Sequence, residues 1–151
     1  MTRIPLSIKS GRLVLVCVIE CRSLRIQKQI TSFILDTGSS DSLISTKDAI
    51  KMQIPLSGKT SSGDIDFGGS RFEKIDLQEF TMYALKENSK ISEHITLKIN
   101  LSALRSNKKS EKKIQVAESL PSILGMDFLK EQNLSLHVIL RENIAYLETY
   151  D

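Results

Sequence analysis

A single acidic residue, Asp36, stands where an apolar segment runs directly into a turn, because residues 33–40 read FILDTGSS. Aspartate is rare in strands and is seldom deeply buried. An acid held at the end of a buried strand therefore needs turn-forming neighbours and hydrogen-bond donors around it. Thr37, Gly38 and Ser39 can supply both, which makes Asp36 the first candidate for acid or base catalysis.

The tripeptide DTG at residues 36–38 is also compatible with an ordinary Asx turn that ends a strand. Its context favours catalysis. Three apolar residues precede it, and a second element, ILG at residues 123–125, lies near the other end of the chain, ahead of a predicted helix. The order and spacing of the two elements therefore support a functional interpretation of Asp36.

The other acidic residues near these motifs are interpreted as structural. Asp127 could supply a second acid within one chain, but it lies at a predicted helix start, where capping and the helix dipole favour aspartate. Asp41, Asp64 and Asp66 are expected in turns or on the surface. Of these, Asp41 is close enough to Asp36 in sequence to contact a substrate.

Apolar patterning predicts a mainly β chain around these motifs. We expect strands at residues 13–19, 24–35, 42–45, 72–85, 95–101, 114–117, 134–140 and 144–147. The first two form a hairpin whose second strand ends at Asp36. Residues 47–52 predict one helical turn closed by Pro55, and residues 123–132 predict one short helix near the C-terminal end.

Two connecting segments are polar. Residues 58–71 carry Gly63, Gly68 and Gly69 and predict a long, mobile hairpin. Residues 106–113 are rich in lysine and predict a solvated loop. A nucleic-acid patch is the less favoured reading of this loop, because no aromatic residues are interleaved with the lysines.

Length and charge limit the classes of function. With 151 residues the chain fits a single domain, residues 1–151. The net charge of +3, from 21 basic and 18 acidic residues, gives no strong attraction to nucleic acid or anionic lipid. No apolar run reaches the roughly 20 residues of a membrane span, and the N-terminus does not resemble a secretory leader. We therefore expect a soluble, cytoplasmic protein with neither nucleic acid nor membrane as a partner.

The cysteines and histidines do not form a recognisable ligand set. Cys17 and Cys21 lie along one predicted strand, where a rise of about 3.3 Å per residue separates them too far for a disulfide. We expect free thiols, as a reducing compartment allows. His94 and His137 stand alone, and no Cys or His spacing suits a metal site. Neither a metal nor another cofactor is expected.

In these motifs the chain resembles the retropepsin-like aspartic proteases, a family of single-domain proteases that includes the retroviral enzymes and their cellular and prokaryotic relatives. The similarity rests on residues 33–40, on the Gly-bearing hairpin, and on residues 122–129, which read SILGMDFL. It extends over about residues 13–148. The resemblance implies a mainly β, closed, barrel-like acid protease fold with one short C-terminal helix and a flap hairpin.

The resemblance also implies roles for the residues of the turn. Asp36 would be the catalytic carboxylate, and Thr37 would brace the turn of a partner. Gly38 would let the backbone approach the substrate. Ser39 would bond to the carboxylate and help to orient it.

Two further sets of residues gain implied roles. Leu124 and Gly125 would pack beneath the active-site turn. The hairpin around residues 60–71 would close over a bound peptide. Its expected flap and substrate-binding residues are Ser62, Gly63, Asp64 and Ile65.

Hydrolysis of this type needs two carboxylates, one to take a proton from water and a protonated one to donate to the carbonyl oxygen. Two acids about 3 Å apart share one proton, because both cannot ionise there. The chain supplies one, so we expect a two-fold homodimer that pairs Asp36 with Asp36 of its mate. The resemblance implies a terminal sheet shared between the two copies, to which residues 144–147 would contribute.

We therefore predict a homodimeric aspartic endopeptidase that hydrolyses peptide bonds of extended polypeptides without a covalent intermediate. The alternative is a catalytically silent module of the same fold that binds peptides or dimerises. The intact DTGS at residues 36–39 favours the enzyme. A pure binding module has no need of a like-charge pair at its centre.

Overall fold

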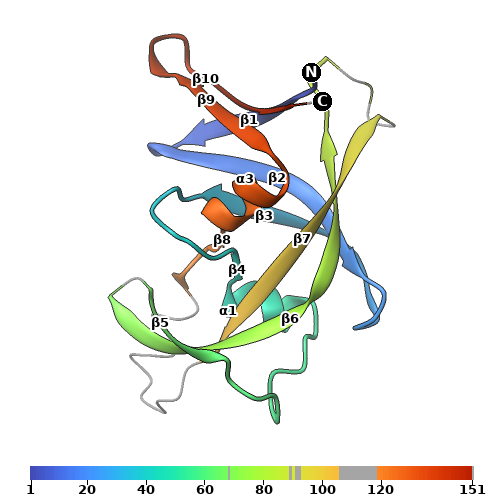
Figure 1. The fold of residues 1–151 in the computed structure, drawn as a ribbon, viewed down its shortest axis with the longest axis vertical. Helices are drawn as coiled ribbons and strands as arrows, with labels where there is room; N and C mark the ends of the chain where they lie inside the picture. The colour runs from blue at the N-terminus through green and yellow to red at the C-terminus, as the bar shows by residue number, and fades with distance from the viewer. Residues whose placement is uncertain (68, 89, 91–92, 106–118, 151) are drawn as a thin grey trace.

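The computed structural model describes residues 1–67, 69–88, 90, 93–105 and 119–150, and most of these residues lie in β-strands (Figure 1). The mainly β class predicted from the apolar patterning is therefore confirmed. The loop expected at residues 106–113 and the strand expected at residues 114–117 lie outside the described residues.

Six strands close into a ring. In order around the ring they are β6 (Ser70–Leu85), β7 (His94–Arg105), β4 (Leu43–Ile44), β8 (Ser122–Leu124), β3 (Ile26–Leu35) and β2 (Arg12–Cys21). The ring closes because β2 pairs with β6 as well as with β3, with Val18 opposite Tyr83. The closed arrangement that the resemblance implies is thus present.

The ring encloses the main hydrophobic core. Alternate residues of β2 point inward, so that Leu15, Cys17 and Ile19 are buried. They belong to one cluster with Phe33 of β3 and Phe80 of β6. Period-2 patterning in the sequence therefore follows the inner face of the sheet.

Both cysteines are free thiols and both are buried. The Sγ atom of Cys17 donates a hydrogen bond to the carbonyl oxygen of Thr31 over 3.7 Å. Burial raises the pKa of the Cys17 thiol to about 12. Cys17 therefore contributes to the core as a neutral, apolar side chain.

Residues 122–124 form a strand, so the helix predicted to open at Ile123 begins later, with α3 at Met126–Glu131. The strand β8 lies between β3 and β4, parallel to the first and antiparallel to the second. Three residues are too few for a periodic pattern. Tertiary pairing with two neighbours makes this segment a strand.

The structure has a second α-helix where one helical turn was expected. Helix α1 spans Thr46–Lys51, and the Oγ atom of Ser45 caps it by accepting a hydrogen bond from the Asp48 amide over 3.1 Å. Within the described residues, α1 thus lies where the helical turn was predicted, and α3 is the short C-terminal helix that the resemblance implied. No helix in this part of the chain combines the length and the apolar character that crossing a membrane requires.

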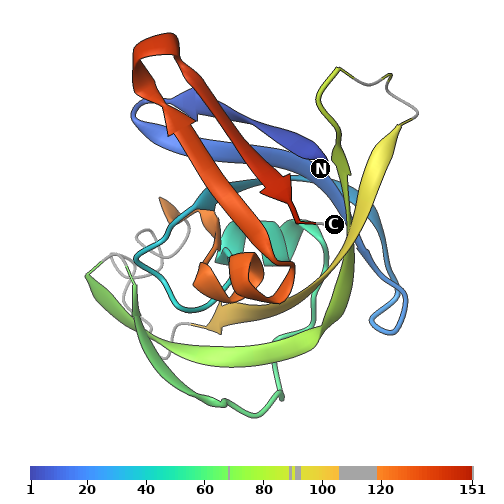
Figure 2. The ribbon, with the colours of Figure 1, turned by 45° about the horizontal axis from the view of Figure 1, so that its top comes forward.

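The two ends of the chain come together in a sheet that continues from β2. Strand β1 (Arg3–Lys9), which the sequence analysis did not predict, pairs with β10 (Ile144–Thr149), and β10 pairs on its other side with β9 (Leu134–Ile139). A 3₁₀ turn, η1 at Leu140–Glu142, joins β9 to β10. Figure 2 shows α3 at the base of this hairpin.

This pairing bears on the expected shared terminal sheet. Both edges of β10 are occupied within the chain, by β1 and by β9. Residues 144–147 therefore have no unpaired edge to offer a partner, and the expected terminal sheet shared between two copies stays a prediction. The free edge at this end of the sheet belongs to β9.

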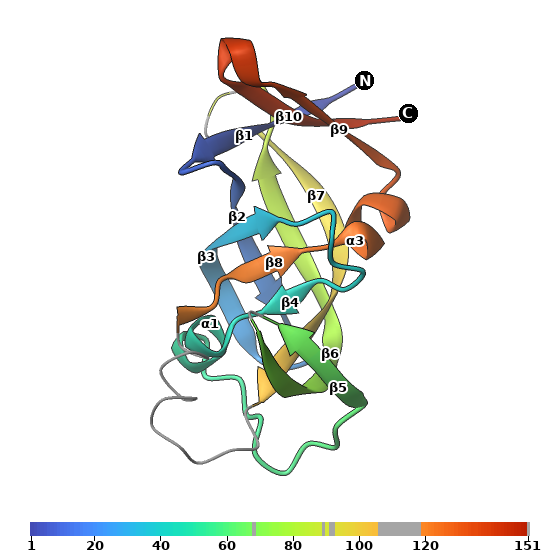
Figure 3. The same ribbon diagram turned by 90° about the vertical axis from the view of Figure 1, so that its left-hand side faces the viewer.

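The Gly-bearing segment forms a hairpin as predicted. Strand β5 (Gly63–Phe67) pairs antiparallel with the first part of β6, from Gly63 opposite Lys74 to Phe67 opposite Ser70. Among the described strands, β5 ends the ten-stranded order and has one edge without a partner. Figure 3 shows the hairpin projecting at the opposite end of the molecule from β9 and β10.

Candidate active site

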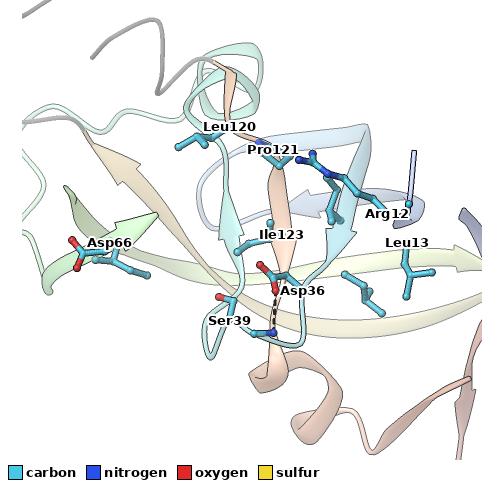
Figure 4. A pocket seen from close by; sticks show the side chains of 13 residues that line it. Arg12, Leu13, Asp36, Ser39, Asp66, Leu120, Pro121 and Ile123 are labelled. Carbon is cyan, nitrogen blue, oxygen red and sulfur yellow. Dashed lines mark hydrogen bonds between the residues drawn. The ribbon is translucent and has the colours of Figure 1, made fainter. Parts of the chain in front are cut away.

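The position of Asp36 follows from the pairing of β3 with β8. Leu35 lies opposite Leu124 in this parallel pair, and the Asp36 amide donates to the Leu124 carbonyl over 2.9 Å. The chain then leaves the sheet. The Asp36 carboxylate is only partly buried, and its Oδ1 atom accepts a hydrogen bond from the Gly38 amide over 2.9 Å (Figure 4).

The segment around Gly125 lies against the loop that follows Asp36. The Met126 amide donates to the Ser39 carbonyl over 2.8 Å. A Cβ atom on Gly125 would lie 2.5 Å from the Asp41 carbonyl oxygen and 2.7 Å from that of Ser39. Only glycine permits this approach, so Gly125 packs closely against the loop, and the supporting role expected for Leu124 and Gly125 stays a prediction.

Ser39 does not bond to the carboxylate of Asp36 as expected. Its Oγ atom donates to the carbonyl oxygen of Asp41 over 2.8 Å, which closes the loop on itself. The hydrogen bond to the Asp36 side chain comes from the Gly38 amide instead. Ser39 therefore shapes the loop, and the backbone orients the acid.

Asp127 joins the loop to helix α3. Its Oδ1 atom accepts from the Ser42 hydroxyl over 2.6 Å and from the Phe128 amide over 2.7 Å, and its Oδ2 atom accepts from the Ser42 amide over 3.1 Å. The Ser42 hydroxyl in turn accepts from the Gly125 amide over 2.9 Å. Both carboxylate oxygens of Asp127 thus serve the structure, as the sequence analysis expected.

A cavity of about 660 Å³ opens beside Asp36. Its floor is formed by the loop and the strands beneath it, and its walls come from three other segments: the β1–β2 turn, the β5 hairpin and the approach to β8. The lining residues are Gly11, Arg12, Leu13, Ile34, Leu35, Asp36, Gly38, Ser39, Ile65, Asp66, Leu120, Pro121 and Ile123. The cavity combines apolar side chains with the polar groups of Arg12, Asp36, Ser39 and Asp66, and its volume lies in the range of ligand pockets.

The expected flap residues divide between those that reach the cavity and those that do not. Ile65 lines it, together with Asp66, whose side chain is largely exposed, as expected of a surface residue. Ser62, Gly63 and Asp64 are not among the lining residues. The Ser62 amide instead donates to the Lys74 carbonyl over 2.8 Å at the base of the hairpin.

An ion pair links strand β6 to the loop of the candidate site. The Nζ atom of Lys74 on β6 lies 3.2 Å from Oδ1 of Asp41, and the two side chains are 26% and 34% exposed. Asp41 is thereby tied to the hairpin rather than presented freely to a substrate. Thr37 is exposed, and its expected contact with a partner turn remains a prediction.

Several lining residues were not predicted. Arg12, Leu13, Leu120 and Pro121 come from segments that are distant from Asp36 in sequence. No local motif marks them, because only the closed ring brings these segments to one place. Within the described residues, no group of three or more His, Cys, Asp or Glu side chains is arranged to hold a metal ion.

Neither a protein-family model nor a curated protein matches the sequence. Among solved structures, a retropepsin-like aspartic protease from Rickettsia conorii superposes with a TM-score of 0.54 at 15% sequence identity, over 96% of this chain and 89% of that one. The retroviral protease-like domain of Ddi1 from Leishmania major gives 0.43 at 11% identity, over 91% and 94% of the two chains. The first comparison shows that this chain has the retropepsin-like fold, as predicted.

Proposed function

We propose that this chain is an aspartic endopeptidase and that it acts as a homodimer in which each copy contributes Asp36. The proposal is carried by one observation: the Asp36 carboxylate, oriented by the Gly38 amide, lies in a cavity of about 660 Å³ on a retropepsin-like fold. Fold alone does not establish function. The position of the Asp36 carboxylate in the cavity supports acid–base hydrolysis of a peptide bond as the reaction.

The need for a second copy follows from the acids that the cavity offers. Hydrolysis requires a second carboxylate within about 3 Å to share the proton. Asp127 is occupied by Ser42 and Phe128. Asp66 lines the cavity from the hairpin, but it is largely exposed and its Oδ1 atom lies 3.8 Å from the Arg71 guanidinium. A two-fold partner would supply the mate.

One face of the molecule suits such a partner. The left edge of Figure 1 carries the tip of the β9–β10 hairpin, the β1–β2 turn, the loop after β3 and the β5 hairpin. Figure 3 looks directly at this face. A second copy facing it about a two-fold axis would bring the two Asp36 loops together, with a flap hairpin from each copy above them.

The reaction would use one ionised and one protonated carboxylate. The ionised acid takes a proton from a water molecule whose oxygen attacks the peptide carbonyl carbon, while the other acid donates its proton to the carbonyl oxygen, which gives a tetrahedral diol. The first acid then gives its proton to the peptide nitrogen, the C–N bond breaks, and the second acid takes a proton back from a hydroxyl of the diol. No bond forms between protein and substrate. The free edge of β5 supports binding of an extended peptide by strand addition beside the cavity.

A subunit-mixing experiment tests both the catalytic role of Asp36 and the requirement for a dimer. Asp36→Asn should abolish cleavage of an unfolded polypeptide between pH 4 and 7. When an equal amount of Asp36→Asn chain is added to a fixed amount of wild-type chain and the subunits exchange, activity should fall to about half, because random pairing places half of the wild-type chains in mixed dimers. A monomeric enzyme would keep its full activity, and that result would contradict the homodimer.

The second candidate is a peptide-binding module without turnover, which the free β5 edge beside the cavity also favours. It predicts that wild type and Asp36→Asn bind an extended peptide equally and that neither cleaves it. Equal cleavage by both would instead indicate a contaminating protease. Cleavage by wild type alone selects the enzyme.

A further inference from the structure

Arg12 brings a positive charge to the wall of the cavity beside Asp36. It is the first residue of β2, directly after the turn at Ser10 and Gly11, and it lines the cavity together with Leu13. Figure 4 shows Arg12 and Asp66 on opposite sides of Asp36. A peptide that crosses the cavity over Asp36 therefore passes Arg12 on one side.

Within the part of the chain that the structure describes, Arg12 has no stabilising partner. In the β1–β2 pair Arg12 stands directly opposite Lys9, and like charges in directly opposed positions destabilise a sheet. Among the ion pairs and hydrogen bonds of the described residues, none involves the Arg12 guanidinium. By contrast, Arg71 on the flap lies close to both Asp64 and Asp66. The fold thus gains no ion pair from a cation at position 12.

We propose that Arg12 is a specificity-determining residue that selects peptides carrying an acidic side chain at a position on its side of the scissile bond. The inference rests on the proposed function and names the substrate class. A guanidinium binds a carboxylate through two parallel hydrogen bonds, and lysine cannot reproduce that geometry. On the opposite side of the cavity the acid Asp66 already has Arg71 beside it, so among the lining residues that the structure describes Arg12 is the cation available to a substrate carboxylate.

The experiment uses peptides that differ at a single position, with Glu, Gln or Lys placed in turn at each position on both sides of the scissile bond. At one or more positions, wild-type protein should cleave the Glu peptide with a kcat/KM about two- to fivefold above that of the Gln peptide, the size expected of an ion pair open to solvent. Arg12→Gln should remove this preference, and Arg12→Glu should reverse it in favour of Lys. Arg25→Gln, which alters net charge equally in the β2–β3 turn, should leave it unchanged.

A binding measurement separates this inference from the proposed function. Asp36→Asn protein should bind a fluorescent Glu peptide more tightly than its Gln counterpart, and the added substitution Arg12→Gln should equalise the two. If wild type cleaves nothing but this binding preference holds, the protease proposal fails and the role of Arg12 stands. A preference that survives Arg12→Gln, or no Glu preference in either assay, overturns the role of Arg12.

Discussion

The close approach of Gly125 to the loop after Asp36 determines how that carboxylate is presented. The glycine leaves room for the Ser39 and Asp41 carbonyl groups at distances that a Cβ atom would make too short. Neighbouring hydrogen bonds, from the Asp36 amide to Leu124 and from Met126 to Ser39, then hold the loop against β8 and α3. The orientation of the acid is therefore set by backbone contacts on both sides of Gly125.

Gly125→Ala should displace this loop. The new methyl group meets backbone atoms that cannot rotate away, so we expect a loss of about 1–3 kcal/mol in the free energy of unfolding and a loss of peptidase activity in the remaining folded protein. Urea unfolding and kcat/KM provide the measurements. Gly58→Ala is the matched control, because a Cβ there meets nothing within 4 Å but its φ of +80° is strained. It should lower stability and leave the activity of the folded protein intact. Equal activity of the two variants would contradict the proposed role of Gly125.

The buried thiol of Cys17 predicts a pH dependence of stability. Burial raises its pKa from 9.0 to about 12 in the folded protein, so between these values the unfolded chain loses the proton while the folded chain keeps it. The contribution of the protonated Cys17 thiol to the free energy of unfolding is therefore fully present below about pH 9. It declines as the pH rises and is smaller by about 1.4 kcal/mol at pH 10. The difference in unfolding free energy between wild type and Cys17→Ala should shrink by this amount from pH 8 to pH 10. A constant difference would contradict the prediction.

At the scale of elements, the sequence predicts long strands well and short or interrupted ones poorly. Alternation identified β2, β3, β6 and β7, because each keeps one face towards the core for several residues. Strand β1 alternates too, with Ile4, Leu6 and Ile8, but Pro5 breaks the expected pattern of a strand. In β8 the pairing with β3 and β4 outweighs any local preference.

Some residues of the candidate site could be predicted from the sequence, and others could not. Asp36 and Gly125 belong to motifs that can be recognised in the sequence, and the structure brings them to the same loop. Arg12 and Pro121 line the cavity only because the ring brings their segments beside that loop. The sequence alone does not decide which acceptor the Ser39 hydroxyl takes, because a serine can donate either to a nearby side chain or to a nearby backbone carbonyl group. In the structure it donates to the Asp41 carbonyl oxygen and not to the Asp36 carboxylate.

At the scale of the whole molecule, the fold leaves apolar side chains uncovered at the tip of the β9–β10 hairpin, on the face proposed for the partner. These residues are Val138, Ile139, Leu140 and Ile144, with exposed fractions of 40%, 42%, 75% and 44%. A cluster of exposed apolar residues is typical of an interaction surface. Because β10 is already paired on both edges, contact there would use side chains and the β9 edge.

Leu140→Glu should therefore weaken the dimer without harming the folded chain. The side chain is 75% exposed, so its replacement removes little core packing, whereas in a dimer it would bury an unpaired carboxylate. We expect the dissociation constant measured by analytical ultracentrifugation to rise by about tenfold or more. Peptidase activity at low protein concentration should fall with it and recover at high concentration.

Leu85→Glu is the matched control for this substitution. Leu85 is 47% exposed at the far end of β6, away from the left edge of Figure 1, so its replacement should leave both dimer and activity unchanged. If Leu140→Glu dimerises as wild type does, the hairpin tip lies outside the interface. If the wild-type chain cleaves peptides while it sediments as a monomer at every concentration, the pairing of two Asp36 residues is itself excluded, because a single chain would then supply both acids.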